Sequence, residues 1–259
     1  MNNTKTITIF HLHRKDGTSL LLHPLRKNHN VIKLIEKNQI IGKYGSEPQV
    51  ETITLFRNQL YRLIEEEVRN WIADIKFIPR FLLSAGAFLL TYLVFSFVVR
   101  DPLPLLDEII IAFGVGTVSY ILLGKKDMRS DAALKKRLTL RKKVDSVVFN
   151  ECGILRDVEN ILQENEQLDT EQLLSRIADP EQITIPETSR DTVQELLSYI
   201  QDTLRTGKSG KPSKSMQKLT DDKKGTGQNQ ETYKKLLKAK CGDLSLFALY
   251  KQLNHSLGR

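Results

Sequence analysis

Four of the five histidines of this 259-residue chain fall near its N-terminus, and their spacing could serve metal binding. His11 and His13 are two residues apart, so on a strand both imidazoles would point to one face. A three-residue loop at Asp16–Thr18 would place His23 opposite His11, whereas a two-residue loop would place it on the other face. Imidazoles bind zinc, but no cysteine accompanies these histidines or His29. We therefore expect surface histidines on a β-hairpin, with no metal bound.

The other residues that could do chemistry do not form a catalytic motif. Gly207-Lys208-Ser209 matches the end of a phosphate loop, but the opening glycine would fall at Asp202, inside an expected helix. The sequence contains neither GxSxG nor HExxH. Cys152 and Cys241 are far apart and lack a metal-type spacing, which indicates reduced thiols in a cytoplasm. We therefore expect a protein that is not an enzyme and has no cofactor.

The longest stretch without a charged residue, Phe81–Val99, could cross a lipid bilayer. Its nineteen residues span about 28 Å at 1.5 Å per residue, close to the thickness of the hydrocarbon core. A second apolar stretch, Leu105–Gly124, follows after Arg100–Pro104, which contains two prolines. Prolines interrupt a helix, and so short a link requires antiparallel neighbours. We therefore expect a two-helix transmembrane hairpin.

The cations that flank the two stretches predict the orientation of the hairpin. Lys76 and Arg80 precede the first stretch, and Lys125, Lys126 and Arg129 follow the second. The turn between the stretches carries a single cation. We therefore expect a multi-pass protein of the inner (plasma) membrane, partnered by the lipid bilayer, with the turn outside and both termini cytoplasmic.

One face of the second stretch is the candidate functional site. Asp107 and Glu108 lie at its start, where wetted carboxylates cost little and the helix dipole favours negative charge. Ala112, Gly116 and Ser119 recur at helical spacing and would let helices approach closely. We expect this small-residue face to pack within one hairpin. The alternative is contact with a second subunit in a homo-oligomer.

The segment before the hairpin predicts a small cytoplasmic α+β region, so that the chain is a mainly α membrane protein. Residues 1–75 would contain a β-hairpin around Asp16-Gly17, with strands over Thr4–His13 and Ser19–Leu25. A short helix is expected over Asn30–Asn38. From Glu51 a second helix would run into the hairpin region, residues 76–126.

After the hairpin, residues 127–205 predict a cytoplasmic helical region. An apolar 3–4 spacing from Asp131 to Glu164, broken at Glu151, favours one long helix with a coiled-coil seam. Capping sequences at Asp169 and Thr188 predict two further helices, which would complete a small bundle.

The end of the chain predicts a tethered tail. Residues 206–230 are almost without apolar side chains, so we expect a disordered linker. Residues 231–259 would form two amphipathic helices around Gly242. Their apolar residues are expected to dock on the acidic bundle, a partner protein or the membrane surface.

Charge alternates along the C-terminal half. Lys125–Lys143 contains nine basic residues, whereas Glu151–Glu195 contains twelve acidic ones, and the end is basic again. Nucleic acid requires one contiguous positive field, so we expect no nucleic-acid partner. Cations near a membrane attract anionic lipid headgroups at about 1 kcal/mol each. The candidate lipid-facing cations, which otherwise form an ordinary solvated face, are Lys135, Lys136, Arg137, Arg141, Lys142 and Lys143.

Three functions are compatible with these features. The first, which we expect, is a membrane-anchored scaffold that recruits a protein partner through its cytoplasmic helices and tail. The second is an oligomeric ion channel or transporter subunit with Asp107 or Glu108 as an acidic mouth. Its outline resembles the mitochondrial calcium uniporter family, whose Asp and Glu are spaced apart on one helix face rather than adjacent. The third is an effector whose hairpin perturbs the membrane.

Overall fold

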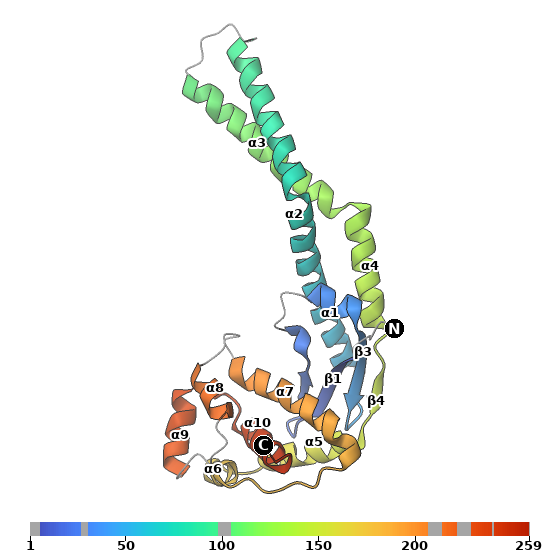
Figure 1. The fold of residues 1–259 in the computed structure, drawn as a ribbon, viewed down its shortest axis with the longest axis vertical. Coiled ribbons are helices and arrows are strands. Elements are labelled where there is room, and N and C mark those ends of the chain that lie inside the picture. Colours follow the sequence, from blue (N-terminus) through green and yellow to red (C-terminus); the bar gives the residue numbers. More distant parts are fainter. Residues whose placement is uncertain are drawn as a thin grey trace. The chain divides into compact units, whose positions relative to one another are not determined.

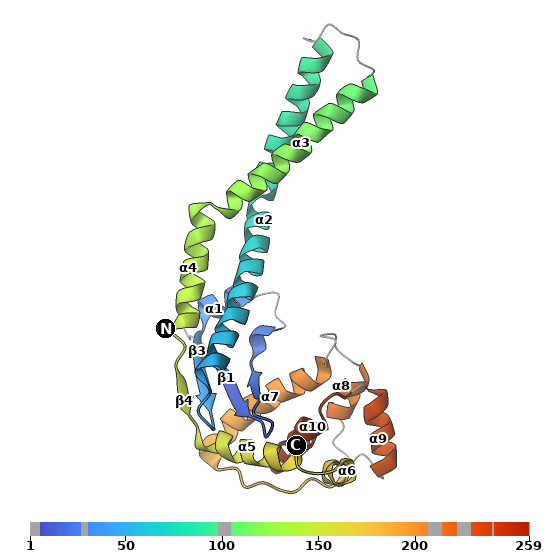
Figure 2. The same ribbon diagram turned by 180° about the vertical axis from the view of Figure 1, so that it is seen from behind.

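The structure is a computed structural model that describes residues 6–26, 31–97, 105–206, 214–221, 229–239 and 241–258. Within these ranges the chain is mostly helical, with a small N-terminal sheet and two candidate membrane-spanning helices (Figures 1 and 2). His29, Val98, Val99 and the predicted turn Arg100–Pro104 lie outside the described residues.

The chain divides into two compact units. The sheet unit comprises Met1–Asn28, Asn38–Leu55 and Val147–Arg259. The hairpin unit comprises His29–Lys37 and Phe56–Ser146. The unit boundaries therefore differ from the predicted division at residues 75, 126 and 205, because segments far apart in the sequence fold together.

The sheet unit contains four strands in the order β2-β1-β3-β4. β1 (Thr6–His13) pairs antiparallel with β2 (Ser19–Leu22) and parallel with β3 (Gln39–Tyr44). β3 in turn pairs parallel with β4 (Phe149–Glu151). The predicted β-hairpin is present, and Gly17 closes its turn at a φ of 79°, a conformation that glycine adopts without steric cost. Strands β3 and β4 were not predicted.

The prediction of one long helix over Asp131–Glu164 is wrong. Helix α4 (Asp131–Asp145) ends where the Ser146 amide donates to the Lys142 carbonyl at 3.0 Å, and helix α5 (Gly153–Asn165) begins only after β4. Between the helices, Val147-Val148-Phe149 consists of β-branched and aromatic residues, which favour strands. The predicted coiled-coil seam is therefore split between two helices.

The other predicted helices of the C-terminal half are present. They are α6 (Thr170–Ala178), α7 (Arg190–Thr206), α9 (Asn229–Lys238) and α10 (Leu244–Ser256). The cap at Asp169 forms as expected: its carboxylate accepts from the Gln172 amide at 2.8 Å, and the Gln172 side chain accepts from the Asp169 amide at 3.2 Å. Thr188 belongs instead to the 3-10 helix Glu187–Ser189, and a second 3-10 helix covers Pro24–Arg26.

The tail is part of the core of the sheet unit, which corrects two predictions. Lys214–Asp221, inside the predicted disordered linker, forms helix α8 and buries Met216 and Leu219; residues 207–213 and 222–228 lie outside the described residues. Helix α10 packs against α5, α6 and α7, and every residue of Leu246–Leu253 is buried. It is therefore a central core helix rather than an amphipathic one.

The hairpin unit consists of α1 (Val31–Lys37), α2, α3 (Leu105–Met128) and α4. Helix α2 (Val50–Phe97), whose first residues belong to the sheet unit, is continuous over 48 residues with Pro79 inside it, about 72 Å at 1.5 Å per residue. The predicted helix from Glu51 into the first apolar stretch is therefore present.

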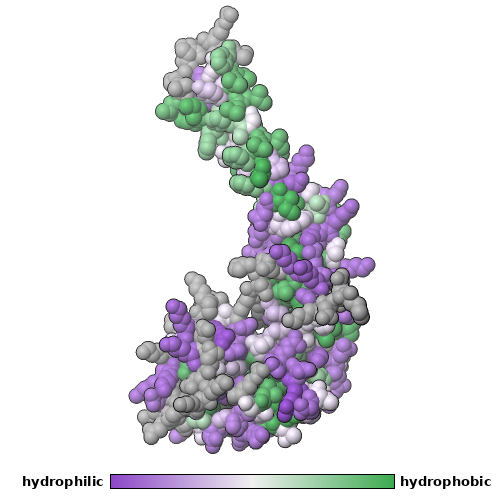
Figure 3. Space-filling model, in the orientation of Figure 1, coloured by the Kyte–Doolittle hydropathy of each residue, from purple (hydrophilic) through white to green (hydrophobic). Residues whose placement is uncertain are grey.

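Helix α2 changes character along its length. From Phe56 to Ile72 it buries an apolar residue at every fourth position, as in a globular protein. Beyond Pro79, and along α3, most large apolar side chains are exposed, and Figure 3 shows them as a largely green surface. Both helices are long and apolar enough to cross a membrane.

Candidate functional site: the seam of the helical hairpin

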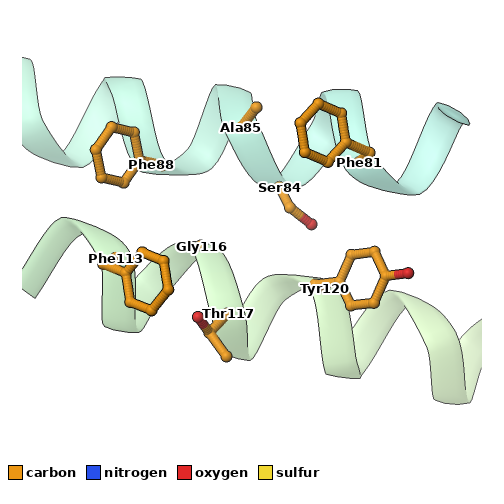
Figure 4. Close-up of a pocket in the computed structure, with 8 residues that line it drawn as sticks. All are labelled: Phe81, Ser84, Ala85, Phe88, Phe113, Gly116, Thr117 and Tyr120. Carbon is orange, nitrogen blue, oxygen red and sulfur yellow. The ribbon is translucent and has the colours of Figure 1, made fainter. Parts of the chain in front are cut away.

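Helices α2 and α3 meet along one face of each, which we call the seam (Figures 1 and 4). On α3, Glu108, Ala112 and Gly116 are buried at successive i, i+4 positions. The seam consists of these three residues and of Ser84, Phe88 and Ser96 of α2. Three of the five predicted site residues therefore lie in it, whereas Asp107 is exposed and Ser119 is half-buried.

Gly116 marks the closest approach of the two helices. A Cβ at this position would lie 3.2 Å from the Phe88 Cβ and 3.3 Å from the Ser84 carbonyl oxygen, so a larger side chain would push on backbone. A Cβ at Gly114, two residues earlier, would meet nothing within 4 Å. The small-residue face therefore packs inside the hairpin at Ala112 and Gly116, and Gly116 is the position at which an added side chain would meet the backbone of α2.

This difference predicts opposite effects for two similar substitutions. Gly116→Leu should lower the free energy of unfolding of the hairpin by roughly 1–3 kcal/mol, because its side chain overpacks the crossing. Gly114→Leu should be neutral or slightly stabilising, since both variants gain about 1 kcal/mol of helix propensity. Denaturation by SDS titration in mixed micelles measures both, and equal stabilities would contradict the assigned crossing.

At one end of the seam, Glu108 forms a polar contact between the helices. Its Oε2 accepts a hydrogen bond from the Ser96 hydroxyl at 2.7 Å, and only 9% of the residue is exposed. Asp107 points elsewhere, as expected for adjacent residues on a helix. The two predicted acids therefore do not act as a pair.

At the other end lies a group that sequence reasoning missed, which we call the Arg80 cluster (Arg80, Tyr120, Gly124 and Asp127). Nε and Nη2 of Arg80 lie 3.2 and 3.0 Å from Oδ2 of Asp127. The guanidinium carbon lies 5.3 Å from the centre of the Tyr120 ring. A Cβ at Gly124 would lie 3.3 Å from Arg80 Nη1, so this glycine makes room for the guanidinium.

The sequence carried a signal for this cluster. A glycine and an acidic residue, Gly124 and Asp127, bracket two lysines at the end of an apolar stretch. Arg80 stands at the matching end of the other stretch, where it was interpreted only as an orientation signal.

Between the two ends, a groove of 390 Å³ lies along the hairpin. It is lined by Phe81, Ser84, Ala85, Phe88, Phe113, Gly116, Thr117 and Tyr120 (Figure 4). The lining is almost entirely apolar, and the Ser84 hydroxyl is already used, since it donates to the Arg80 carbonyl oxygen at 2.8 Å. The groove therefore offers packing rather than a set of convergent catalytic groups.

The predicted lipid-facing cations of α4 have other partners. Lys136 pairs with Glu36 of α1 at 2.5 Å and lies 5.0 Å above the ring of Trp71. Lys143 donates to the Ile35 carbonyl oxygen at 2.9 Å and also to that of Glu36, so it caps the C-terminus of α1. These lysines hold α4 to α1 and α2.

The two arginines of α4 have a similar role. Arg137 Nε and Arg141 Nη2 pair with the two oxygens of Glu65 at 2.9 and 2.7 Å. Of the six cations, only Lys135 and Lys142 are exposed without an ion pair to another described residue. The other four have partners within the hairpin unit that the sequence does not reveal, because those partners lie on other helices; lipid contact by this face stays a prediction.

The histidines do not form a metal site among the described residues. Five residues, Arg14–Thr18, connect β1 and β2, so His11 pairs with Leu21 and His23 lies beyond the end of β2. Both His11 and His23 are buried, which corrects the expectation of surface histidines. His11 Nε2 lies 3.0 Å from the Ser19 hydroxyl.

A buried carboxylate lies close to His11. Glu159 of α5 is 1% exposed, and its two oxygens accept from the Ser46 hydroxyl at 2.7 Å and from the His13 amide at 3.0 Å. Burial lowers the pKa of His11 below 6.5, and the negative charge of Glu159 opposes this shift only in part. His11 is therefore held as a neutral imidazole.

This burial predicts a pH dependence of the sheet unit. Because the native pKa of His11 lies below its unfolded value, the unfolded state binds the proton first on acidification. The contribution of His11 to stability should be complete above about pH 6.5 and decrease as the pH falls below it. Urea unfolding at neutral and mildly acidic pH should show this loss in the natural chain and a smaller one in His11→Gln. Equal losses would contradict the prediction.

Comparison with known proteins does not extend this description. No protein-family model, curated protein or solved structure matches the chain. The seam is a helix-packing contact. It contains one close crossing at Gly116 and a polar contact at each end, Ser96–Glu108 and Arg80–Asp127.

Proposed function

We propose that the chain is a membrane-anchored, non-catalytic scaffold of the inner (plasma) membrane, with α2 and α3 as a transmembrane hairpin. The observation that carries this proposal is the outward orientation of large apolar side chains: Leu90 is 67% exposed, Phe113 68% and Leu82 63%. Exposing apolar surface to water costs about 25 cal/mol per Å². A lipid bilayer removes this cost, whereas a soluble core helix would have buried these side chains.

The proposed orientation places both soluble ends in the cytoplasm. Lys125, Lys126 and Arg129 are exposed at the end of α3, and cations of this kind are retained on the cytoplasmic side. The Arg80 cluster would then lie at the cytoplasmic end of the seam and Glu108 at the outer end.

In the proposed scaffold, the partner protein binds a surface of the sheet unit. The tail was the predicted recruiting element, but residues 246–253 of α10 are all buried in the core and are not free to bind a partner. Within the described residues, β4 pairs only with β3, and Val148 beside it is 63% exposed. An open strand edge can accept a strand of a partner protein, so we place the recruiting surface there.

The contacts of Glu108 favour the anchor over a pore. Glu108 accepts from Ser96 of its own hairpin, so of the two predicted acids only Asp107 would be free to form an acidic mouth in a ring of subunits. In the anchor, the same contact simply satisfies a polar pair at the outer end of the seam.

The scaffold is tested with photoreactive amino acids introduced into the full chain in its native membrane. We expect one discrete protein adduct with the probe at Val148, and none with the probe at Lys15, which is also exposed but lies on the β1–β2 loop. Equal adducts at both positions, or none at either, would count against the recruiting edge.

The channel is tested separately with the purified full chain in liposomes. We expect no cation flux above that of empty liposomes. Flux that is lost in the double variant Asp107→Asn with Glu108→Gln would overturn the scaffold in favour of the channel.

A further inference from the structure

Five side chains at one end of the hairpin combine positive charge with exposed apolar surface. Lys125 and Lys126 of α3 and Arg129 in the turn that follows it are exposed, and none forms an ion pair with another described residue. On α2, Phe77 and Ile78 are 53% and 66% exposed. We call these five residues the collar.

The Arg80 cluster fixes the relative depth of the collar residues. Arg80 contacts both Gly124 and Asp127, so this point of α2 lies level with residues 124–127 of α3. Because the helices are antiparallel, Phe77, about 4.5 Å before Arg80, lies at about the same height along the hairpin as the residues that follow Asp127. Phe77 and Ile78 are therefore at about the depth of Arg129, one turn from Lys125 and Lys126.

Apolar and cationic side chains at the same depth in a bilayer are typical of the boundary between the lipid headgroups and the acyl chains. Aromatic rings are favoured there, and the stems of lysine and arginine reach from it to the phosphates. The Phe77 ring also stacks on that of Phe81, at 6.2 Å between centres, which continues the apolar surface into the first span.

The nearby acidic residues leave the positive charge of the collar largely uncompensated. Asp127 is paired with Arg80, and the two exposed acids in this part of the described chain, Asp74 of α2 and Asp131 at the start of α4, form no ion pair with a collar residue. Four of the six α4 cations are already bound to groups within the hairpin unit, which leaves only Lys135 and Lys142 of that described helix exposed and without an ion pair.

We propose that the collar is a binding surface for anionic phospholipid, with Lys125, Lys126 and Arg129 on the headgroups and Phe77 and Ile78 at the acyl boundary. This inference rests on the proposed membrane anchor and names its lipid. Each cation near an anionic surface raises the local preference for anionic lipid by about fivefold.

The test is lipid selectivity of the reconstituted full chain, measured by electron paramagnetic resonance with spin-labelled phosphatidylglycerol and phosphatidylcholine. We expect phosphatidylglycerol to be preferred at low salt, and the preference to weaken as salt screens the charges. In Lys125→Gln/Lys126→Gln/Arg129→Gln the preference should fall by roughly tenfold or more. In the control Lys135→Gln/Lys142→Gln, which removes two exposed cations of α4, it should stay unchanged.

The outcomes separate the two proposals. Equal selectivity in the natural chain and the triple variant, or an equal loss in the α4 control, would overturn the collar while leaving the anchor in place. A chain that does not associate with the reconstituted bilayer would overturn the anchor itself. Insertion from detergent does not depend on the flanking cations, and circular dichroism checks that each variant is folded.

Discussion

Asp127→Ala should lower the free energy of unfolding of the hairpin unit by roughly 3 kcal/mol, the largest effect we expect from a single change there. The side chain of Arg80 is only 9% exposed, and that of Asp127 is 22% exposed. Removing the carboxylate leaves the guanidinium at the end of the seam beside the Tyr120 ring and without its counter-ion. An unpaired buried charge costs far more than the pair contributes as a net stabilisation.

Two further variants show that the loss comes from the orphaned charge. Arg80→Leu with Asp127→Leu removes both charges and should recover most of the stability, because apolar residues can replace a buried pair. Glu66→Ala removes an exposed acid of α2 and should cost less than about 0.5 kcal/mol. SDS titration in mixed micelles provides the comparison. A double variant no more stable than Asp127→Ala would contradict the assigned pair.

Phe247→Ala should destabilise the sheet unit by about 3–5 kcal/mol, the usual cost of removing a buried aromatic side chain. Phe247 is fully buried in α10, and its ring lies 6.3 Å from that of Tyr250. This cost has two parts. One is the lost transfer free energy of the aromatic ring, and the other is the cost of the cavity that remains because the helices around α10 cannot close it.

Tyr233→Ala on α9 is the matched control, since this aromatic residue of the same tail is 37% exposed. Its loss should cost under about 1 kcal/mol. Urea unfolding of the full chain, monitored by circular dichroism, measures the loss of stability in both variants. Similar small effects for the two variants would mean that the tail is a peripheral segment and that α10 is not part of the core.

The sequence predicted the elements whose signals are local. The apolar runs of α2 and α3, the turn at Gly17 and the capping box at Asp169 depend on residues a few positions apart. The same holds for the spacing of Ala112 and Gly116, which placed them on one helix face. Each was recognisable without knowing its neighbours in space.

The strands that were missed depend on partners far along the chain. β3 contains Gly42 and Lys43, which give it no clear alternating pattern. A Cβ at Gly42 would lie 2.3 Å from the Phe149 ring, so this glycine is explained only by β4, more than a hundred residues later. The segment from Val147 to Phe149 was predicted to be helical for the same reason, because its strand partner β3 is far away in the sequence.

Charge was the least informative signal about the site. Arg137 and Arg141 stand in a basic run, but their partner Glu65 lies on another helix. Arg80 was interpreted as an orientation signal only, and its partner Asp127 lies 47 residues further along the chain. Opposite charges distant in sequence form ion pairs only once the fold places them together.

The central claim, that α2 and α3 form a hairpin that crosses the membrane with both ends inside, is tested most directly by cysteine labelling in intact cells. The chain with Cys152 and Cys241 replaced by serine carries a single new cysteine, either Asp107→Cys at the outer end of α3 or Lys142→Cys on α4. A membrane-impermeant maleimide should label Asp107→Cys in intact cells and Lys142→Cys only after the membrane is permeabilised. Labelling of Lys142→Cys in intact cells, or of neither position until permeabilisation, would contradict the hairpin topology.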